Sequence, residues 1–436
     1  MQPLTASDHL QTTRGRWIWL LSGTLTIGAI GAFGGWAAVR ASNPHFGPQP
    51  TFVIPTRTVT VTAPVTALNV QSYGAPIKVT AVPSGPVRIA ESIAYDPADG
   101  RPPTVTHRDS HGLLTLAAPA CANSDCSVGF SVTVPSGVTV TATAAGGGVT
   151  VLGTGAADID SGGGPVYAAG IAGQLTVSAE GGGVTVNNAA GADLDSGGGP
   201  VDASGIAGML TVHAEGGGVT VSHAPTAAID SGGGPVDAAG IAGQLTVKAE
   251  GGGVTVTGAG ATEIDSGGGP VTASTISGPL GVSAEGGGVE VSGVTGTLNV
   301  DTGGGPLSAT SLTSPSATVN GDGGSVTLGF LTAPTSVRVD TGGGDALLSV
   351  PGGPYAVAAN TGGSQESVLI ATSPGAASSI SVTTDGGNLQ IGPSGTSVSQ
   401  SDSTGLTTGD GSPAQPVRPV RPVRPVQPVK PVGQKG

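Results

Sequence analysis

The chain has 436 residues, of which 79 are Gly and 34 are Pro, so these two residue types make up about a quarter of it. Only 10% of the residues are charged and 3% are aromatic, both well below an ordinary globular enzyme, and the formal net charge is −13. Glycine does not recur at every third position, which excludes collagen, and a mean hydropathy of +0.19 excludes highly charged disorder.

An apolar stretch near the N-terminus predicts a membrane anchor. Residues 17–39 are uncharged and lie between Arg16 and Arg40. As a transmembrane helix they would be ~34 Å long, enough to cross a hydrocarbon layer of about 30 Å. The three tryptophans lie near the two ends of the stretch, where such rings prefer the membrane interface. The basic residues before it predict a cytoplasmic tail at residues 1–16 and an exported remainder.

A cleaved signal peptide is the alternative for this stretch. The sequence Val-Arg-Ala at 39–41 is a poor small-x-small cleavage site, and the apolar part of a signal peptide usually has only about 7 to 15 residues. We therefore favour an uncleaved anchor, followed by an extracytoplasmic linker and first strand at residues 40–64.

The two cysteines of the chain, Cys121 and Cys126, lie among the strand-like segments of residues 65–140. Outside the membrane, so close a pair is most simply a disulfide that closes a short loop. Zinc would need two further ligands, and His107 and His111 do not complete a recurring zinc-ligand spacing. Because repeat folds need an atypical end cap, we expect residues 65–140 to be an N-terminal cap pinned by this hairpin.

Residues 141–393 form a repeat marked by triple glycines. From Gly146 to Gly286 the intervals between triplets alternate between 16 and 19 residues, which gives a 35-residue repeat of two unequal halves. Valine and leucine alternate with threonine in short runs, the pattern of a half-buried strand, and the glycines permit tight corners. Stacking the sequence at 35 residues produces apolar columns, such as Ile159, Leu194, Ile229 and Ile264, or Leu175, Leu210, Leu245 and Leu280.

These features predict an all-β chain folded as a right-handed β-solenoid, with one coil for each half-repeat. A single half-repeat cannot bury its apolar face, whereas stacked coils share one continuous aliphatic core. Ten clear glycine corners and four degenerate ones predict about 14 coils.

The C-terminal segment has a different composition. Residues 394–415 are rich in Ser, Thr and Gly and predict a flexible linker. Residues 416–436 then repeat Pro-Val-Arg, and this period of three matches the three residues per turn of polyproline II. One ridge of the rod would carry the cations Arg418, Arg421, Arg424 and Lys430. We expect this ridge to bind an anionic cell-wall polymer, and the competing target is the acidic repeat of the same chain.

Several of these pieces occur in the order found in a known family. Residues 112–116 lead to Cys121, and Cys126 leads to the strand and turn at residues 131–137, ahead of the glycine-cornered repeats. In this order, residues 65 to about 395 resemble the bacterial "putative adhesin" family of DUF4097-type β-strand repeat proteins. The resemblance implies a β-helix-like domain at the bacterial cell surface. Regular triple glycines and the Pro-Val-Arg tail depart from the family pattern.

The repeat predicts no catalytic site, because near-identical coils offer no place where a nucleophile, a base and an oxyanion donor would differ from their surroundings. His213 and His223 are predicted to lie on the surface, since other repeats have unrelated residues in their columns. A β-helix enzyme acting on polysaccharides is the alternative, and it needs a base or paired acids in a cleft. Unlike charges converging in a groove outside the repeat columns would favour that alternative. No cofactor is predicted.

The repeat is strongly acidic, with 15 Asp and Glu between residues 141 and 310 against Lys248 alone. The sign of this charge excludes nucleic-acid binding by the repeat. One acidic column contains Asp160, Asp195, Asp230 and Asp265, and another contains Glu180, Glu215, Glu250 and Glu285. Members of a column would be ~9.6 Å apart, beyond the ~8 Å Debye length, so a solvated acidic face is the simplest interpretation. Calcium is the alternative. Its candidate ligands are Asp158, Asp160, Asp195, Asp230 and Asp265.

Together, these observations predict a single-pass protein of the bacterial cell membrane, held in the lipid bilayer by residues 17–39. Its main domain would be extracellular, structural or adhesin-like, and without catalytic activity. A polysaccharide-active enzyme, a calcium-stabilised module and an envelope-polymer-binding module are the alternatives.

We expect replacement of both Cys121 and Cys126 by Ser to lower the free energy of unfolding by ~2 kcal/mol or less, because so small a loop removes little entropy from the unfolded chain. Thermal unfolding of the exported protein measures this change. Two free thiols in the purified, non-reduced protein would contradict the disulfide.

Overall fold

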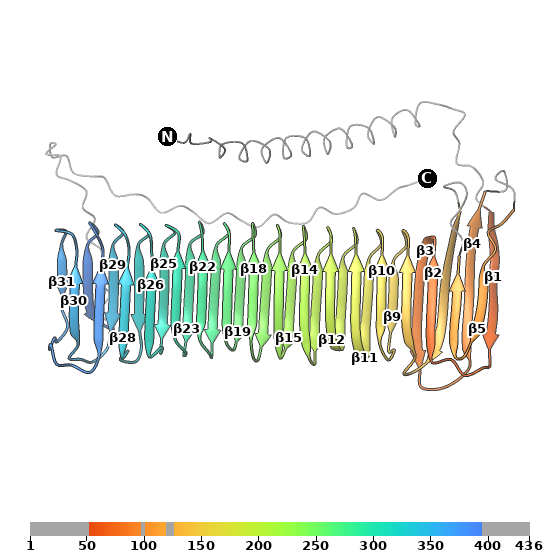
Figure 1. Cartoon of the computed structure of the whole chain (residues 1–436), viewed down its shortest axis with the longest axis horizontal. Helices are drawn as coiled ribbons and strands as arrows, with labels where there is room; N and C mark the ends of the chain where they lie inside the picture. The colour runs from red at the N-terminus through yellow and green to blue at the C-terminus, as the bar shows by residue number, and fades with distance from the viewer. Residues whose placement is uncertain (1–51, 97–100, 119–125, 395–436) are drawn as a thin grey trace, which may run out of the picture. The chain divides into compact units, whose positions relative to one another are not determined.

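The computed structural model describes residues 52–96, 101–118 and 126–394. Every regular element within these ranges is a β-strand, and most of the strands stack in parallel into one elongated solenoid (Figure 1). This confirms the predicted all-β solenoid. No helix of membrane-spanning length and hydropathy occurs within the described ranges. The predicted anchor at residues 17–39 and the tail at residues 416–436 lie outside them.

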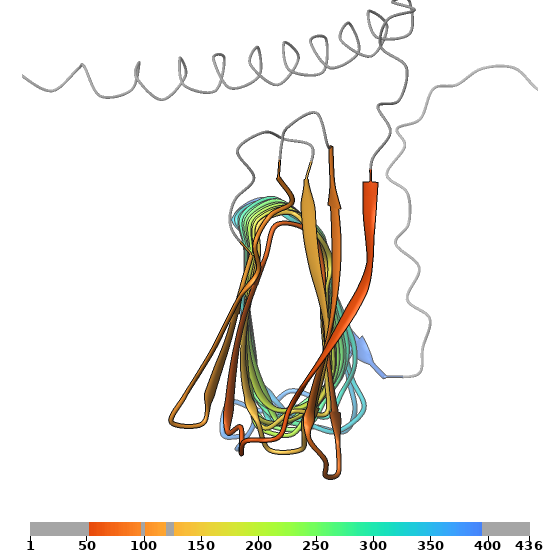
Figure 2. The same cartoon turned by 90° about the vertical axis from the view of Figure 1, so that its right-hand side faces the viewer.

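The solenoid has two faces, which Figure 2 shows as the long sides of a flattened ring. Face A carries the strand that precedes each glycine corner. Its strands are β2 (Ala67–Ser72), β5 (Thr106–Ser110), β6 (Leu113–Ala117), β8 (Thr139–Ala144), β10 (Ala157–Ser161), the second halves of β11 (Val166–Ala179) and β12 (Val184–Ser196), β14 (Met209–Ala214), β16 (Thr226–Ser231), β18 (Leu245–Ala249), β20 (Thr262–Ser266), β22 (Leu280–Ala284), β24 (Leu298–Thr302), β26 (Ser316–Asn320), β28 (Ser336–Asp340), β30 (Ala356–Asn360) and β32 (Ser379–Thr383).

Face B carries the strand that follows each corner. Its strands are β1 (Phe52–Val61), β3 (Gly74–Val82), β4 (Val87–Tyr95), β7 (Ser127–Pro135), β9 (Val149–Leu152), the first halves of β11 and β12, β13 (Val201–Ile206), β15 (Val219–Ala224), β17 (Val236–Ile241), β19 (Val254–Ala259), β21 (Val271–Ile276), β23 (Val289–Val294), β25 (Leu307–Leu312), β27 (Val326–Phe330), β29 (Ala346–Val350), β31 (Glu366–Val368) and β33 (Leu389–Pro393).

Neighbouring coils pair in parallel and in register. On face A, Ala157 lies opposite Leu175, and Leu175 lies opposite Ala192, so successive coils are 18 and 17 residues long. Two coils therefore make the 35-residue repeat, as predicted. The halves of the repeat are nearly equal, which corrects the expectation of unequal halves taken from the glycine intervals.

The glycine intervals alternate because the triplet begins at different places in equally long corners. After Ser161 the corner is Gly-Gly-Gly-Pro, and after Ala179 it is Glu-Gly-Gly-Gly. Both corners reach the next face B strand after four residues. A shift of one residue in the start of the triplet converts coil lengths of 17 and 18 into glycine intervals of 16 and 19.

One column of corner positions accepts only glycine. A Cβ atom on Gly182 would overlap the carbonyl group of Gly164 in the preceding coil, and a Cβ on Gly199 would overlap that of Gly182. The same overlap recurs along the stack, at Gly217, Gly234, Gly252, Gly269, Gly287, Gly305, Gly324, Gly344 and Gly387. Backbone therefore rests directly on backbone at these corners, and this contact sets how closely their coils stack.

Alternate corners contain a buried serine that the sequence analysis did not single out. The Oγ of Ser161 donates a hydrogen bond to the carbonyl oxygen of Gly164 at 2.8 Å, and the Oγ of Ser231 donates to that of Gly234 at 3.0 Å. Ser196 and Ser266 make the same bond in their own corners. These serines are fully buried, and buried alanines such as Ala179 take their place in the coils between. The serine bonds satisfy corner carbonyls that would otherwise lack a partner.

The core is the continuous aliphatic stack that the columns predicted. Leu175, Val177 and Leu194 are each no more than 1% exposed, and the other members of their columns are buried as well. Tyr167, the single aromatic residue between 141 and 310, is 41% exposed. Between residues 141 and 310, the buried apolar side chains are Val, Leu, Ile and Ala. The buried aromatics Phe130, Phe330 and Tyr355 lie in coils near the two ends of the stack.

At the N-terminal end the coils are not stacked in chain order. Strands β2 and β3 lie between the later pairs β6/β7 and β8/β9. Strand β4 then adds to β7, β1 to β4, and β5 to β6, all antiparallel. Residues 65–140 thus supply two coils of the stack as well as the antiparallel strands β4 and β5 at its end. The antiparallel strands β1, β4 and β5 end the parallel ladder, which protects its edge.

The C-terminal end is also stacked out of chain order. Strands β32 and β33 insert between the earlier pairs β28/β29 and β30/β31. The connection contains Tyr355, which is 1% exposed and donates a hydrogen bond to the carbonyl oxygen of Pro351 at 2.5 Å. Burial raises the pKa of this phenol. Twelve coils, from β8/β9 to β28/β29, follow one another in chain order. The last two of the 14 expected corners belong to the coils β30/β31 and β32/β33, which are stacked in reversed order.

The corner contact predicts a large difference between two adjacent glycines. A Cβ on Gly269 would overlap the carbonyl group of Gly252, whereas a Cβ on Gly268 has no atom within 4 Å. We expect Gly269→Ala to lower the local free energy of unfolding by roughly 1–3 kcal/mol, because the coils must move apart. Gly268→Ala is the matched control and should change it by less than about 0.5 kcal/mol. Hydrogen exchange in β20 and β22 measures both, and equal effects would contradict the close corner contact.

Candidate functional site

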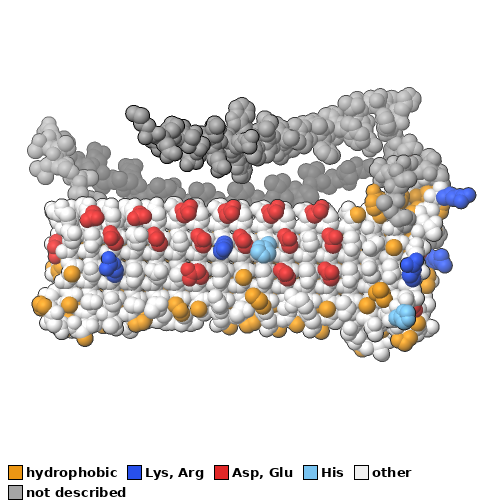
Figure 3. Space-filling model, in the orientation of Figure 1, with side chains coloured by type: hydrophobic (Ala, Val, Ile, Leu, Met, Phe, Trp, Pro, Cys, Tyr) orange, Lys and Arg blue, Asp and Glu red, His pale blue; other side chains and the backbone are white. Residues whose placement is uncertain are grey.

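Acidic side chains form three rows on face A and its glycine corner (Figure 3). The corner row consists of Glu180, Glu215, Glu250 and Glu285, all exposed. The next row contains Asp160, Asp195, Asp230, Asp265 and Asp301, also exposed. The third row contains the exposed residues Asp158, Asp193 and Glu263. Because the Glu and Asp rows use alternate coils, each coil in this part of the stack contributes one carboxylate to the edge of face A. Twelve of the 15 acids between residues 141 and 310 lie on this side; Asp202, Asp237 and Glu290 lie on face B.

The row of aspartates is interrupted by neutral or basic residues in the coils between. Ser178 lies between Asp160 and Asp195, and Lys248 lies between Asp230 and Asp265. His213 Nδ1 is 3.8 Å from Asp230 Oδ2, and both side chains are more than half exposed. The surface position predicted for His213 is confirmed, and His223 is exposed too. An exposed pair of this kind contributes little to stability.

The calcium alternative finds no support in the described residues. Asp160, Asp195 and Asp230 are separated by intervening coils, at about 9.6 Å per step if coils are ~4.8 Å apart. Within residues 52–96, 101–118 and 126–394, no group of three or more His, Cys, Asp or Glu side chains could hold a metal ion. Calcium needs six to eight oxygen ligands at about 2.3–2.6 Å, which carboxylates at this spacing do not supply together.

Face B carries fewer charged side chains than face A between residues 141 and 310. Threonines of alternate coils, such as Thr185 and Thr220, flank Asp202 in one outward column. The next column carries small polar residues, and Ser204 Oγ donates a hydrogen bond to Asn187 Oδ1 at 2.6 Å. The two faces thus differ sharply in charge, although every coil contributes one strand to each of them.

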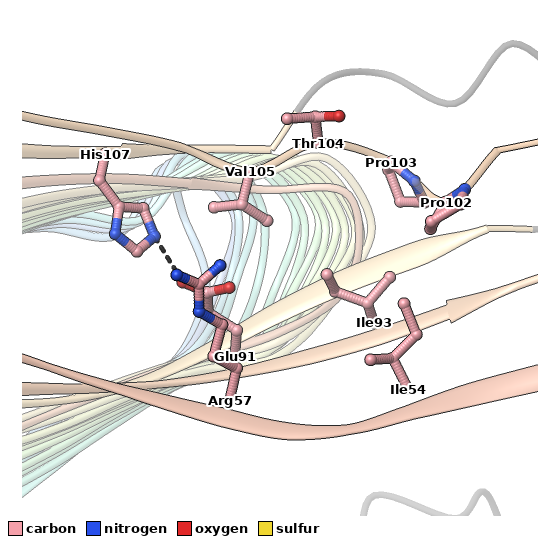
Figure 4. Close-up of a pocket in the computed structure, with 9 residues that line it drawn as sticks. All are labelled: Ile54, Arg57, Glu91, Ile93, Pro102, Pro103, Thr104, Val105 and His107. Carbon is pink, nitrogen blue, oxygen red and sulfur yellow. Dashed lines mark ion pairs between the residues drawn. The ribbon is translucent and has the colours of Figure 1, made fainter.

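A pocket of about 480 Å³ lies at the N-terminal end of the solenoid, between the face B strands β1 and β4 and the segment that leads into β5. Its lining residues are Ile54, Arg57, Glu91, Ile93, Pro102, Pro103, Thr104, Val105 and His107. Figure 4 shows His107 and Val105 on one side of the pocket and Ile54, Ile93, Arg57 and Glu91 on the other. The pocket lies outside the repeat columns.

Glu91 is the unusual residue of this pocket. It occupies an inward position of β4, after Val87 and Ile89, and is only 4% exposed. Its Oε1 forms an ion pair with Nε2 of His107, whose side chain is 27% exposed. Apart from His107, no described residue donates a hydrogen bond to this oxygen. Since a buried carboxylate is costly without a partner, the pair ties β4 to β5 across the end of the stack.

Arg57 brings a third charge to the same place. It is the cross-strand neighbour of Glu91 in the β1–β4 ladder, and it is exposed. The pocket therefore combines one carboxylate, one imidazole and one guanidinium with aliphatic walls. Such a set could hold a small polar ligand or transfer a proton, but it contains a single carboxylate, whereas glycoside hydrolysis typically uses two.

The sequence analysis missed this site, although a signal was present. The alternation Val87, Ile89, Glu91, Ile93 places an acid where the strand pattern demands an apolar residue. The other predicted site residues divide into two groups. Cys126 precedes β7 and is not a free cysteine, while Cys121 lies outside the described residues, so their disulfide stays a prediction. The tail cations Arg418, Arg421, Arg424 and Lys430 also lie outside them.

Comparison with known proteins leaves the family open. The chain matches no protein-family model, and no curated protein is similar to it. Among solved structures, a "putative adhesin" from Parabacteroides distasonis is 11% identical with a TM-score of 0.22, covering 77% of this chain and 98% of its own. A "putative cell adhesion protein" from Clostridium sporogenes is 8% identical with a TM-score of 0.15, covering 78% and 99%. At such scores neither likeness bears on function.

The Glu91–His107 pair predicts a specific loss of stability. We expect His107→Ala to lower the free energy of unfolding of the N-terminal strands by roughly 1–3 kcal/mol, because it leaves the Glu91 carboxylate buried without its partner. Glu91→Gln in the same background should recover part of the loss, since it removes the buried charge. His213→Ala, at an exposed histidine, is the control and should have little effect. Hydrogen exchange in β4 and β5 tests this, and a His107 effect no larger than the control would contradict it.

Proposed function

We propose that the chain is an adhesin-like structural protein of the bacterial cell surface, with no catalytic role for its solenoid. The observation that carries the proposal is the stack of twelve coils in chain order, each presenting the same outward positions over one aliphatic core. A rod of this kind suits a stalk or a repeated binding surface. It does not suit a catalytic site, which needs unlike groups at one place.

The finer parts of the proposal rest on sequence. Residues 17–39 would hold the protein in the membrane as a single-pass anchor, with residues 1–16 in the cytoplasm and the solenoid outside. The solenoid would be right-handed, and Cys121 and Cys126 would form a disulfide near its N-terminal end. The family resemblance to DUF4097-type proteins supports a surface role. For the tail cations, an anionic wall polymer and the acidic repeat are competing partners.

Surface exposure and binding test this function together. The full-length protein is produced in bacteria, and intact cells are treated with a membrane-impermeant amine reagent. We expect exposed Lys248 to be labelled in intact cells, because the solenoid lies outside the membrane. Labelling that appears only after lysis would overturn the location. The solubilised protein is then assayed against immobilised envelope polymers and matrix proteins, where retention by at least one of them is expected.

The end pocket supports a second candidate function, an enzyme or receptor for a small polar ligand. This candidate is supported by the pocket lining, where Glu91, His107 and Arg57 lie together outside the repeat columns. Incubation of the full-length protein with polysaccharides, followed by detection of new reducing or unsaturated ends, separates the two functions. Turnover that is abolished by Glu91→Gln and retained in His213→Ala would establish the enzyme and replace the structural function.

A further inference from the structure

We propose that the pocket at the N-terminal end of the solenoid binds a free α-amino acid with an aliphatic side chain. The ammonium group of this ligand would bond Glu91, its carboxylate would bond Arg57, and its side chain would lie against the aliphatic walls of the pocket. The inference rests on the second candidate function, a receptor for a small polar ligand, and it names the class of ligand.

Two opposite charges interrupt the inward columns of the strands that end face B. In β4, the buried Glu91 follows Ile89 in the inward column. In β1, Arg57 lies directly opposite Glu91, and Val59 lies opposite Ile89. Residues that lie opposite each other in an antiparallel ladder point to the same side of the sheet, so both charges face the pocket. An acid and a base thus replace apolar residues at one pair of inward positions.

Both charged groups can still accept a ligand. Within the described ranges, the pair with His107 is the sole interaction of the Glu91 carboxylate, and a carboxylate has about four acceptor positions. The guanidinium of Arg57 forms no ion pair with any carboxylate of these ranges, Glu91 included. With the imidazole neutral, one negative and one positive charge remain in the pocket. A ligand that carries one charge of each sign therefore matches them.

The separation of the two side chains suits an α-amino acid. Residues opposite each other in an antiparallel ladder have Cβ atoms about 4.5–5.5 Å apart. In an α-amino acid, one carbon joins the nitrogen and the carboxyl carbon, with bonds of about 1.46 and 1.52 Å, so the two charged groups are also close together. A single ligand can therefore bond Glu91 and Arg57 at once. Both bonds would be charge-assisted, the stronger kind of hydrogen bond.

The rest of the lining is mostly apolar and would select the side chain of the ligand. Ile54 and Ile93 lie opposite each other beside the charged pair, and Val105 faces them across the pocket (Figure 4). Pro102 and Pro103 add two further apolar side chains. Such walls leave the several hydroxyl groups of a sugar without partners, which is costly, whereas they pack well against a leucine or valine side chain. The volume of about 480 Å³ lies in the range of small-ligand sites.

Calorimetric titration of the full-length protein with L-leucine tests the proposal. We expect leucine to bind with a dissociation constant below about 1 mM. Leucinamide lacks the carboxylate, and 4-methylpentanoate lacks the amine. Each should bind at least about tenfold more weakly than leucine, because each loses a hydrogen bond between charged groups. Binding of either analogue as tight as that of leucine would overturn the proposal, as would the lack of any leucine binding.

Substitutions at the two charged positions test which group bonds which end of the ligand. Arg57→Gln and Glu91→Gln should each weaken leucine binding at least about tenfold. Arg57→Gln should leave the affinity for leucinamide unchanged, because that ligand has no carboxylate to lose. Arg88→Gln is the matched control, since it removes an exposed arginine from an outward position of β4. Thermal unfolding checks that each variant is folded, and effects no larger than that of the control would overturn the proposal.

The same titration separates the ligand from the function on which it rests. Binding of glucuronate that is abolished by Glu91→Gln, with no binding of leucine, would retain a receptor in this pocket but overturn the amino acid as its ligand. Leucine binding without any turnover of polysaccharides would support the amino acid and a receptor rather than an enzyme. Labelling of Lys248 in intact cells tests the adhesin-like function independently of both results.

Discussion

Each coil of the solenoid rests on its neighbour through backbone alone at the glycine corner. At Gly182 and its equivalents the preceding carbonyl group occupies the space that a Cβ atom would need. The corner therefore fixes the separation of the coils, and the parallel ladders on faces A and B keep neighbouring residues in register. This stacking brings residues that are separated by 17 or 18 positions in the sequence into the same column.

The columns explain both the core and the surface. Inward positions combine into a continuous aliphatic stack, because Leu, Val and Ile of successive coils meet directly. Outward positions combine into rows of like charge, which the two-coil repeat spaces at ~9.6 Å, so their repulsion at physiological salt is modest. The alternation of buried Ser161 with Ala179 follows the same two-coil rule. A regular array of carboxylates is thus a direct consequence of coil geometry, available to any partner with a matching period.

The ends of the stack obey different constraints. A ladder that simply stopped would leave unpaired backbone groups, which invite association with another sheet edge. Here the chain folds back at both ends and inserts an earlier or later pair of strands into the stack. The buried aromatics and the Glu91–His107 pair lie near these ends, where the repeat no longer dictates each residue. Any chemistry specific to one position is therefore expected at an end of the rod.

The sequence by itself determined the solenoid, its 35-residue repeat and its inward columns, because each coil repeats the same local pattern and Ile159, Leu194 and Ile229 mark the period. It also determined the surface positions of His213 and His223. Only the tertiary structure showed that the two kinds of corner have the same length, because the glycine triplet begins one residue later in one kind than in the other. The reversed order of strands at both ends depends on pairing between distant segments, which no local pattern encodes. The Glu91–His107 pair likewise exists only because β4 and β5, from opposite faces, meet across the end of the stack.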